Sequence, residues 1–341
     1  MDRVPVIALT GYLGAGKTSL LNHLLRRPGA RLGVVVNDFG ALNVDAALVT
    51  GQVDEAVSIS GGCLCHLPDA GGLEDALHKL SRPRMRMDAI LVEASGAADP
   101  IALHGLIRAS RVPGIRPGGL IEVIDAVQHF RTVDRSPEPP ARFAAATLAV
   151  ISKADLLPAG ERDEVLARIG ARVRQRQPHV QIVTARHGRI DPALVFDTAT
   201  DQDPVDELPL AQLYRDQHHD AGDHEQARAA SVALTRPVRA SLLVDLLERP
   251  PAGAYRIKGR LRVYGARAEQ GYVVNVVGPL IHLTPLPQPP AVGELVAIGS
   301  DLDQPAAQQR LEAVASAPAG GPDPDGLRRL RRYRTLSAVR R

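Results

Sequence analysis

Short apolar runs recur along the first two hundred residues and alternate with segments of helical periodicity. The runs have the length and the Val, Ile and Leu content of buried strands; they span 4–9, 32–37, 88–96, 120–125, 147–151 and 181–185. Apolar residues at helical spacing follow at 19–25 and 73–80, and Pro100 stands at a favoured first helical position. This alternation predicts an α/β domain over residues 1–197, with a mostly parallel sheet and helices on both faces.

The pattern changes after residue 197. Residues 198–230 are polar and predict a linker, in which His218, His219 and His224 could hold metal or could belong to a solvated loop. Further apolar runs alternate with helical patterns and predict a smaller α+β domain over 231–316. The Pro/Gly-rich and Arg-rich stretch 317–341 is typical of a disordered or weakly helical tail.

The net charge, the length of the apolar runs and the cysteine count indicate which kinds of partner and cellular location the sequence disfavours. The formal net charge of the 341 residues is only +3, and much of the surplus lies in the tail, so the charge does not indicate a nucleic-acid partner. No apolar run approaches the roughly 20 residues of a membrane helix, and the chain starts without a signal-peptide pattern. Two cysteines one residue apart are not a disulfide framework. We expect a cytoplasmic protein without a membrane or nucleic-acid partner.

The first apolar run leads into Gly11-Tyr12-Leu13-Gly14-Ala15-Gly16-Lys17-Thr18, which fits the phosphate-binding loop (P-loop) pattern. A strand, a glycine loop and a helix N-terminus form a nest of N–H groups that binds anions. Lys17 would reach the β- and γ-phosphates, and the Thr18 hydroxyl would hold Mg²⁺. The predicted phosphate-binding residues are Gly11, Gly14, Ala15, Gly16, Lys17, Thr18 and Ser19.

Acidic residues farther along the chain are candidates for catalysis. Glu93 ends an apolar run, where a carboxylate can bind the Mg²⁺ shell or orient the attacking water, and the Gly96 N–H can sense the γ-phosphate. Asp45 lies where a nucleotide-sensing switch loop would be and could reach Mg²⁺, although a plain surface turn explains it equally well. Lys17, Glu93 and Asp45 form the predicted catalytic set.

Ser152-Lys153-Ala154-Asp155 follows the run 147–151. In guanine-binding P-loop proteins an Asn-Lys-x-Asp at this place reads the base: the Asp accepts from the guanine N1–H and exocyclic amine, and the Lys stem packs along the ring. Ser152 departs from Asn, but Lys153 and Asp155 match and favour GTP over ATP. The chain has only four lysines, and two of them, Lys17 and Lys153, stand in these two motifs.

Cys63, Cys65 and His66 place two thiols and an imidazole within four residues, just after two glycines. In an extended segment the two thiols point to the same side, whereas His66 would need a turn to join them. Thiolate and imidazole favour Zn²⁺, Cu⁺, Co²⁺ or Ni²⁺ over Mg²⁺ or Ca²⁺. Three ligands leave a position that Asp38 or a partner protein could fill. The alternative is that both cysteines only pack.

Together these motifs resemble the CobW-type family of metallochaperone GTPases, within the SIMIBI class of P-loop GTPases. The resemblance rests on residues 11–18, 37–40 with Asp45, 62–65, 93–96 with 99–100, and 153 with 155; residues 255–260 and 295–303 are similar to the family's C-terminal domain. Two positions depart from the family pattern, because His66 stands where a third cysteine is usual and Ser152 replaces Asn.

The resemblance implies GTP hydrolysis with Mg²⁺ and delivery of a transition metal, Zn²⁺ or Co²⁺, to a client metalloprotein under nucleotide control. The site would be the Cys-x-Cys-His segment, the metal would be zinc before the others, and a homodimer is possible. One alternative is an assembly factor for a cobalt or iron enzyme or a corrinoid pathway. Another is a nucleotide-dependent interaction protein without metal. A small-molecule kinase shares the P-loop but has no use for Lys153 and Asp155.

Overall fold

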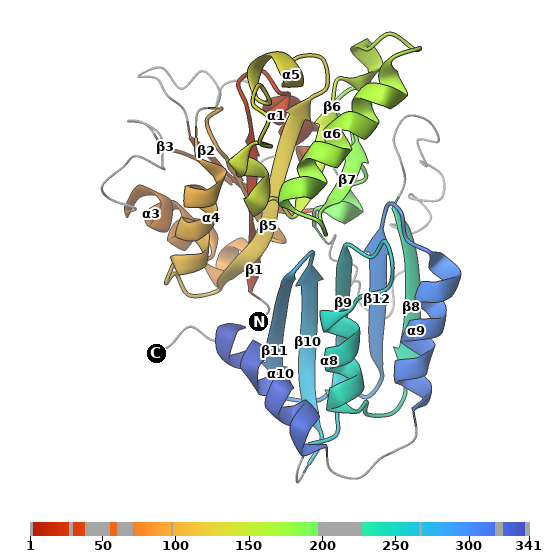
Figure 1. The fold of residues 1–341 in the computed structure, drawn as a ribbon. Coiled ribbons are helices and arrows are strands. Elements are labelled where there is room, and N and C mark those ends of the chain that lie inside the picture. The colour runs from red at the N-terminus through yellow and green to blue at the C-terminus, as the bar shows by residue number, and fades with distance from the viewer. Residues whose placement is uncertain are drawn as a thin grey trace.

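Two sheets organise the protein (Figure 1). The computed structural model describes residues 3–26, 30–37, 55–59, 71–96, 98–196, 227–265, 268–317 and 323–337. Within them a seven-stranded sheet is followed along the chain by a five-stranded one. The predicted fold class, a parallel α/β domain followed by a smaller α+β domain, is confirmed.

The first sheet is parallel throughout, with the strand order β3-β2-β4-β1-β5-β6-β7. Its strands are β1 (Val4–Gly11), β2 (Leu32–Asn37), β3 (Glu55–Ile59), β4 (Ala89–Glu93), β5 (Ile115–Asp125), β6 (Leu148–Ser152) and β7 (Gln181–Thr184). Because β1 lies between β4 and β5, the loops that leave these three strands meet at one edge of the sheet. This is where open α/β sheets bind their ligands.

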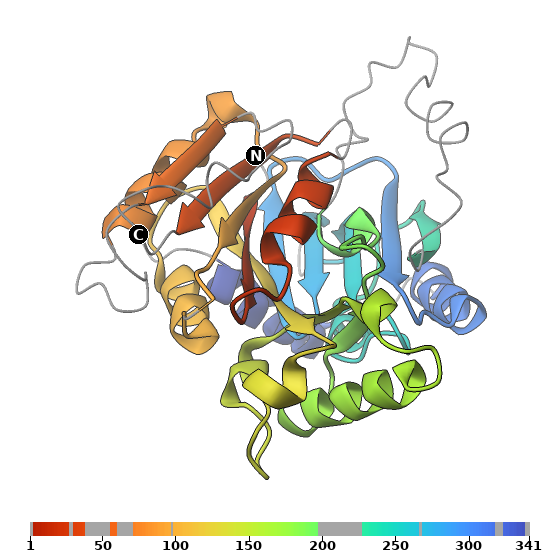
Figure 2. The same ribbon diagram turned by 90° about the horizontal axis from the view of Figure 1, so that it is seen from above.

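Helices cover both faces of the parallel sheet (Figures 1 and 2). On one face lie α1 (Lys17–Leu25) and the short η4 (Pro192–Leu194); on the other lie α3 (Gly71–Leu80), α4 (Pro100–Ala109), η2 (Ala141–Ala145) and α6 (Arg162–Arg176). Short turns of helix at η1 (Pro83–Met85), α5 (His129–Thr132) and η3 (Ala154–Leu156) connect the rest. Burial on both faces explains why the strands read as continuous apolar runs rather than alternating ones.

The second sheet is antiparallel, with the order β11-β10-β9-β12-β8. It consists of β8 (Arg228–Leu234), β9 (Arg256–Val263), β10 (Gln270–Val277), β11 (Leu280–Leu286) and β12 (Gly293–Gly299). The helices α8 (Ala240–Glu248), α9 (Gln304–Ser316) and α10 (Pro324–Ser337) share one apolar core with it and lie on one face (Figure 1).

The structure differs from the sequence-based expectation at four places. The strands β3 and β11 were not predicted; β11 is only half-buried and contains Pro285, so its apolar pattern is weak. The predicted linker 198–230 overlaps β8, which already begins at Arg228. Disorder is the wrong prediction for part of the tail, because α10 buries Leu327 and Leu330 in the second core. Residues 197–226, with His218, His219 and His224, lie outside the described residues.

The two domains touch at the amino ends of β5, β6 and β7, away from the edge that carries the P-loop (Figure 1). The buried Tyr255 hydroxyl lies 3.0 Å from Thr147 Oγ1, the residue before β6, and the Tyr255 ring belongs to the core of the first domain. Gln181, which begins β7, donates to Ser300 Oγ at 2.7 Å. The second domain is therefore anchored to the amino ends of the strands β5 to β7, and the predicted base-reading motif follows the opposite end of β6.

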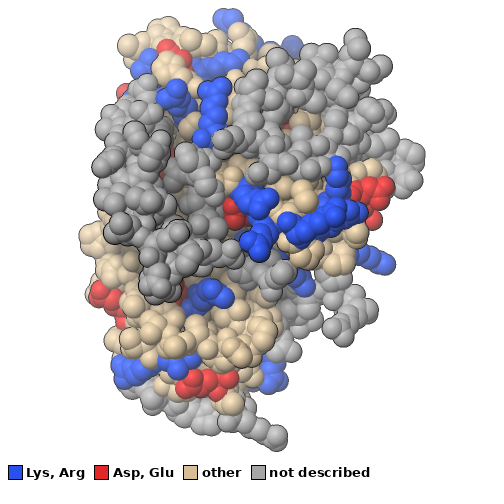
Figure 3. Space-filling model, turned by 180° about the vertical axis from the view of Figure 1, so that it is seen from behind, with Lys and Arg blue, Asp and Glu red and all other residues tan. Residues whose placement is uncertain are grey.

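Several exposed arginines precede strands of the parallel sheet, at its amino-terminal edge. They are Arg31 before β2, Arg82, Arg84 and Arg86 before β4, and Arg111 before β5. Figure 3, which shows the back of the molecule, has a group of Lys and Arg side chains near its middle with acidic side chains beside it. Among the helices that the structure describes, none has both the length and the apolar content needed to cross a membrane.

Candidate functional site

The P-loop connects β1 to α1, and its shape depends on glycine. Gly14 and Gly16 have φ angles of +74° and +96°, a left-handed conformation that residues with a Cβ rarely adopt. The Ala15 N–H donates to Tyr12 O at 3.0 Å and closes the turn. Because α1 starts immediately after Gly16, the loop brings its N–H groups to the positive end of a helix dipole. This confirms the predicted strand, loop and helix context.

Lys17 is buried and folds back over the loop. Its Nζ donates to Gly11 O at 3.0 Å and to Tyr12 O at 3.3 Å. The ammonium is thus held at the mouth of the loop by two carbonyl groups, whose attraction for a cation is weaker than that of a phosphate. Ser19, the next predicted residue, lies beside the loop after β7, where a Cβ added to Gly188 would be 3.2 Å from the Ser19 Cβ.

Two oxygen-bearing side chains meet at the start of α1. The Thr18 hydroxyl donates to Glu93 Oε1 at 2.8 Å, and Glu93, the last residue of β4, is 4% exposed. A hydroxyl and a carboxylate are the oxygen ligands that Mg²⁺ prefers, so the pair fits this ion. The parallel sheet brings together these two residues, which are 75 apart in sequence: α1 follows β1 through the P-loop, and Glu93 ends the neighbouring strand β4 at the same edge.

Gly96 follows Glu93 and packs directly against the P-loop. A Cβ at Gly96 would lie 2.6 Å from the backbone nitrogen of Leu13, so only glycine allows this approach. After it, Asp99 caps α4 by accepting from the Ile101 N–H at 2.9 Å, with Pro100 as the first helical residue, as predicted. The loop between β4 and α4 is therefore fixed at its helical end and touches the P-loop at Gly96.

Ser152 connects the predicted base-reading motif to the P-loop. Its hydroxyl lies 2.6 Å from Ala15 O and 3.1 Å from Ile124 O, and it is buried at the end of β6. The residue that departs from the usual Asn therefore bridges β6, β5 and the P-loop through its side chain.

Lys153 and Asp155 follow Ser152 on the same edge. Lys153 has φ +58°, a left-handed conformation that costs a residue with a Cβ about 1–2 kcal/mol. Its ammonium donates to Asp125 Oδ2 at 2.6 Å. Asp155 is partly exposed and lies 3.4 Å from His187 Nδ1 in the loop after β7. The structure thus gathers Lys153, Asp155 and the P-loop at one end of the sheet.

Asp125 and Glu122 were not among the predicted site residues. Both belong to the run 120–125, and a carboxylate inside or at the end of an apolar run is the signal that could have identified them. Glu122 is 2% exposed; it accepts from Thr10 Oγ1 at 2.6 Å and bonds Arg142, and burial, opposed by these two partners, raises its pKa. Thr10 precedes Gly11, so this network supports the base of the P-loop.

A pocket of about 200 Å³ adjoins the outer side of the P-loop. Its lining includes Tyr12 to Gly14, Glu122, Asp125 and Lys153, with α5 as the far wall, but neither Thr18 nor Asp155. It therefore meets the predicted nucleotide-binding residues at Gly14 and Lys153 and does not extend to Thr18 or Asp155.

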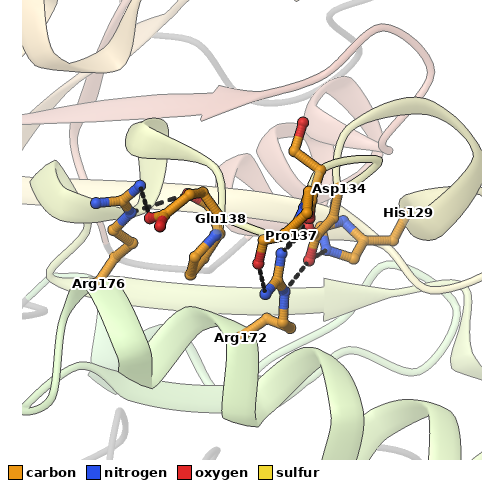
Figure 4. A network of polar contacts seen from close by, with 8 residues as sticks. His129, Asp134, Pro137, Glu138, Arg172 and Arg176 are labelled. Carbon is orange, nitrogen blue, oxygen red and sulfur yellow. Dashed lines mark hydrogen bonds and ion pairs between the residues drawn. The ribbon is translucent and has the colours of Figure 1, made fainter.

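Arginines of α6 hold the far wall of this pocket in place (Figure 4). Arg172 makes a two-point ion pair with Asp134, at 2.7 and 2.6 Å, and also donates to Ser136 O and Pro137 O. These hydrogen bonds lower the pKa of Asp134. His129 is buried 3.4 Å from Asp134, and burial lowers the pKa of its imidazole more strongly than Asp134 raises it.

Five predicted site residues lie outside the described part of the chain: the transition-metal candidates Asp38, Cys63, Cys65 and His66, and the catalytic candidate Asp45. Within the described ranges, no group of three or more His, Cys, Asp or Glu side chains is arranged to hold a metal ion. The roles assigned to these five residues stay predictions.

Comparison of the sequence with known protein families and relatives agrees with the family resemblance that the motifs indicate. The family model described as CobW/HypB/UreG, nucleotide-binding domain, matches residues 5–183, and the model of the cobalamin synthesis protein cobW C-terminal domain matches 227–315. The zinc chaperone YjiA of Escherichia coli is 29% identical over 280 residues, which cover 78% of this chain and 84% of YjiA. The zinc chaperone CobW of a Sinorhizobium species is 27% identical over 323 residues, with coverages of 79% and 88%.

Among solved structures, a crystal structure of the Zn(II)-bound YjiA GTPase from E. coli aligns with a TM-score of 0.43 and 20% identity, over 92% of this chain and 99% of that one. The family assignment rests on the sequence models, since the nucleotide-binding model alone spans more than half of the chain. The protein thus belongs to the CobW/HypB/UreG family and is a GTPase.

Proposed function

We propose that this GTPase is a metallochaperone that binds a transition metal, zinc first, at Cys63, Cys65 and His66 and delivers it to a client protein under nucleotide control. Family membership and the zinc chaperones among its relatives support the metal. The observation that links metal to nucleotide is the position of β3. This strand ends at Ile59, four residues before Cys63, on the edge of the parallel sheet that carries the P-loop.

In this proposal the following residues of the chain carry out GTP hydrolysis. Lys17 and the P-loop N–H groups bind the β- and γ-phosphates of GTP, and Asp155 accepts from the guanine N1–H and amine. Thr18 and Glu93 would hold Mg²⁺, which neutralises phosphate charge when bound. Glu93, and Asp45 as a second candidate, orient the attacking water for in-line displacement.

Nucleotide control follows from contacts between the loops. Gly96 rests on the backbone of Leu13, so a γ-phosphate that rearranges either segment acts on the other. The metal motif lies between β3 and α3 in sequence, and β3 shares the sheet with these loops. GTP and GDP would then favour different arrangements of the thiols, which releases the metal to the client in one state. The C-terminal domain is the proposed client-recognition surface.

The test is a zinc titration by calorimetry of the apo, GDP-bound and GTP-analogue-bound protein. We expect near-stoichiometric Zn²⁺ uptake that Cys63→Ser weakens strongly, with an affinity that differs at least fivefold between the two nucleotide states. Identical zinc affinity in all three states would contradict nucleotide-controlled delivery. No uptake, and no effect of Cys63→Ser, would favour an interaction switch whose cysteines only pack.

Competition with cobalt, nickel and iron in the same titration separates a zinc carrier from an assembly factor for a cobalt or iron enzyme. The homodimer and the cytoplasmic location are further predictions. Sedimentation of the full chain would test the first, and localisation of the full chain would test the second. The domain limits also stay predictions.

A further inference from the structure

The ammonium of Lys153 is directed at Asp125. The distance from Lys153 Nζ to Asp125 Oδ2 is 2.6 Å, and the Asp125 side chain is only 11% exposed, against 34% for Lys153. A short contact to a largely dehydrated carboxylate is a strong charge-assisted hydrogen bond. The Lys153 ammonium is therefore bound by a carboxylate of the protein itself, within the motif that is proposed to contact the nucleotide.

Asp125 is held in place by hydrogen bonds that do not involve Lys153. Its Oδ1 accepts from the Val127 N–H at 2.8 Å and the Gln128 N–H at 3.0 Å, which closes the turn after β5. The neighbouring strand adds a constraint, since Asp125 pairs in register with Ser152 and the Ala126 N–H donates to Ser152 O at 3.0 Å. One carboxylate oxygen thus shapes the turn, and the other is aimed at the lysine.

The ion pair also orients the Lys153 side chain. The residue has a φ of +58°, in the left-handed region, and without a partner its flexible side chain would sample many directions. The ion pair selects one direction and brings the lysine ammonium to the end of β5, where Asp125 is the last residue.

We infer that Asp125 is a positioning residue for nucleotide recognition: it anchors the Lys153 ammonium so that the lysine stem forms a fixed platform for the purine ring. The inference rests on the proposed base-reading role of Lys153 and Asp155. In this arrangement the positive charge of Lys153 serves the platform and not the phosphates. Asp125 then affects GTP affinity through Lys153 and leaves triphosphate binding to the P-loop.

The experiment compares Asp125→Asn, Lys153→Met and the double variant in the full chain. Asn keeps an oxygen for the Val127 and Gln128 N–H groups, and Asp125→Ser is a second variant that retains this turn; Met keeps the stem but not the ammonium. We expect Asp125→Asn and Lys153→Met each to raise the Kd for GTP about tenfold, the usual loss for one charge-assisted hydrogen bond. The double variant should be no weaker than either single one.

Inorganic tripolyphosphate, which has no base, should inhibit the variants and the parent equally well, whereas a merely damaged fold would weaken the binding of both GTP and tripolyphosphate. Asp245→Asn is the matched control, since it removes the charge of one of the two carboxylates that pair with Arg329 in the second domain. Unchanged GTP affinity in Asp125→Asn and Asp125→Ser, beside a loss in Lys153→Met, would overturn the positioning role and leave base reading intact. Unchanged affinity in Lys153→Met would overturn both.

Discussion

The phosphate end and the base end of the proposed nucleotide site are built differently. At the phosphate end the contacts of the lysine are local: Lys17 bonds carbonyls five and six residues before it, and the loop is shaped by Gly14 and Gly16. At the base end the contacts cross the fold, since Lys153 meets Asp125, 28 residues away, and Ser152 meets Ala15, 137 residues away. The first end is mainly backbone, and the second is an arrangement of side chains.

This difference indicates how each end tolerates change. A backbone nest needs glycine and one cation, so a single wrong residue in it removes the phosphate site. Side-chain contacts between strands are adjustable, because a serine can bridge where asparagine is usual. We therefore expect large losses from changes at the phosphate end and graded changes in base preference at the other.

The largest effect is expected for Lys17→Ala. It removes the cation held at the mouth of the P-loop, and loss of one such electrostatic stabiliser lowers kcat/KM for GTP by about 10²–10³. Release of phosphate under single-turnover conditions measures it. Lys79→Ala, on the exposed face of α3, is the matched control. A Lys17→Ala protein that hydrolyses GTP as fast as the parent would show that this loop does not hold the phosphates.

Glu93→Gln should have the next largest effect. The amide can still accept from the Thr18 hydroxyl, so the local contact survives while the negative charge is lost. We expect the Mg²⁺ concentration for half-maximal hydrolysis to rise about tenfold and kcat to fall by a similar factor. A Mg²⁺ titration of the steady-state rate measures both. A normal Mg²⁺ requirement would place the ion's ligands elsewhere.

The sequence predicted the strand, loop and helix around Lys17 well, and the surroundings of Lys153 only in part. The P-loop, the strand before it and the helix after it are contiguous, so the spacing of Gly11, Gly16, Lys17 and Thr18 contains the geometry. The partner of Lys153 lies on another strand, and no local spacing relates Asp125 to it. Likewise α10 was predicted disordered or weakly helical, because its anchors Leu327 and Leu330 only acquire partners once the second sheet has formed.

Asp155→Asn should change base preference more than rate. Asparagine presents a donor where guanine N1–H and the amine need acceptors, so GTP affinity should fall about tenfold. Xanthosine triphosphate, which has a carbonyl in place of the amine, should lose less or gain. Competition binding with GTP, ATP and xanthosine triphosphate measures this, and Asp163→Asn on the exposed side of α6 is the control. Unaltered GTP preference would remove Asp155 from the base site.

The smallest effect concerns the pocket wall at the base end. Because burial lowers the pKa of His129 in the folded protein, the unfolded chain binds its proton first as the pH falls. The contribution of neutral His129 to stability is therefore present above the unfolded pKa of about 6.5 and is lost progressively below it. Thermal unfolding at pH 7.5 and 5.5 should show a smaller pH-dependent drop for His129→Gln than for the parent, by a few degrees.

The comparison of the parent with His129→Gln isolates the contribution of one group. Glu122, which lines the same pocket, has a raised pKa and responds to pH in the opposite direction, but it is present in both proteins. Asp134 and the guanidinium groups of Arg172 and Arg142 face the imidazole and are common to both proteins. If the base end depends on this wall, GTP affinity should follow the same pH trend while tripolyphosphate inhibition stays flat. Equal pH-dependence of unfolding in both proteins would show that His129 keeps its ordinary pKa in the folded state.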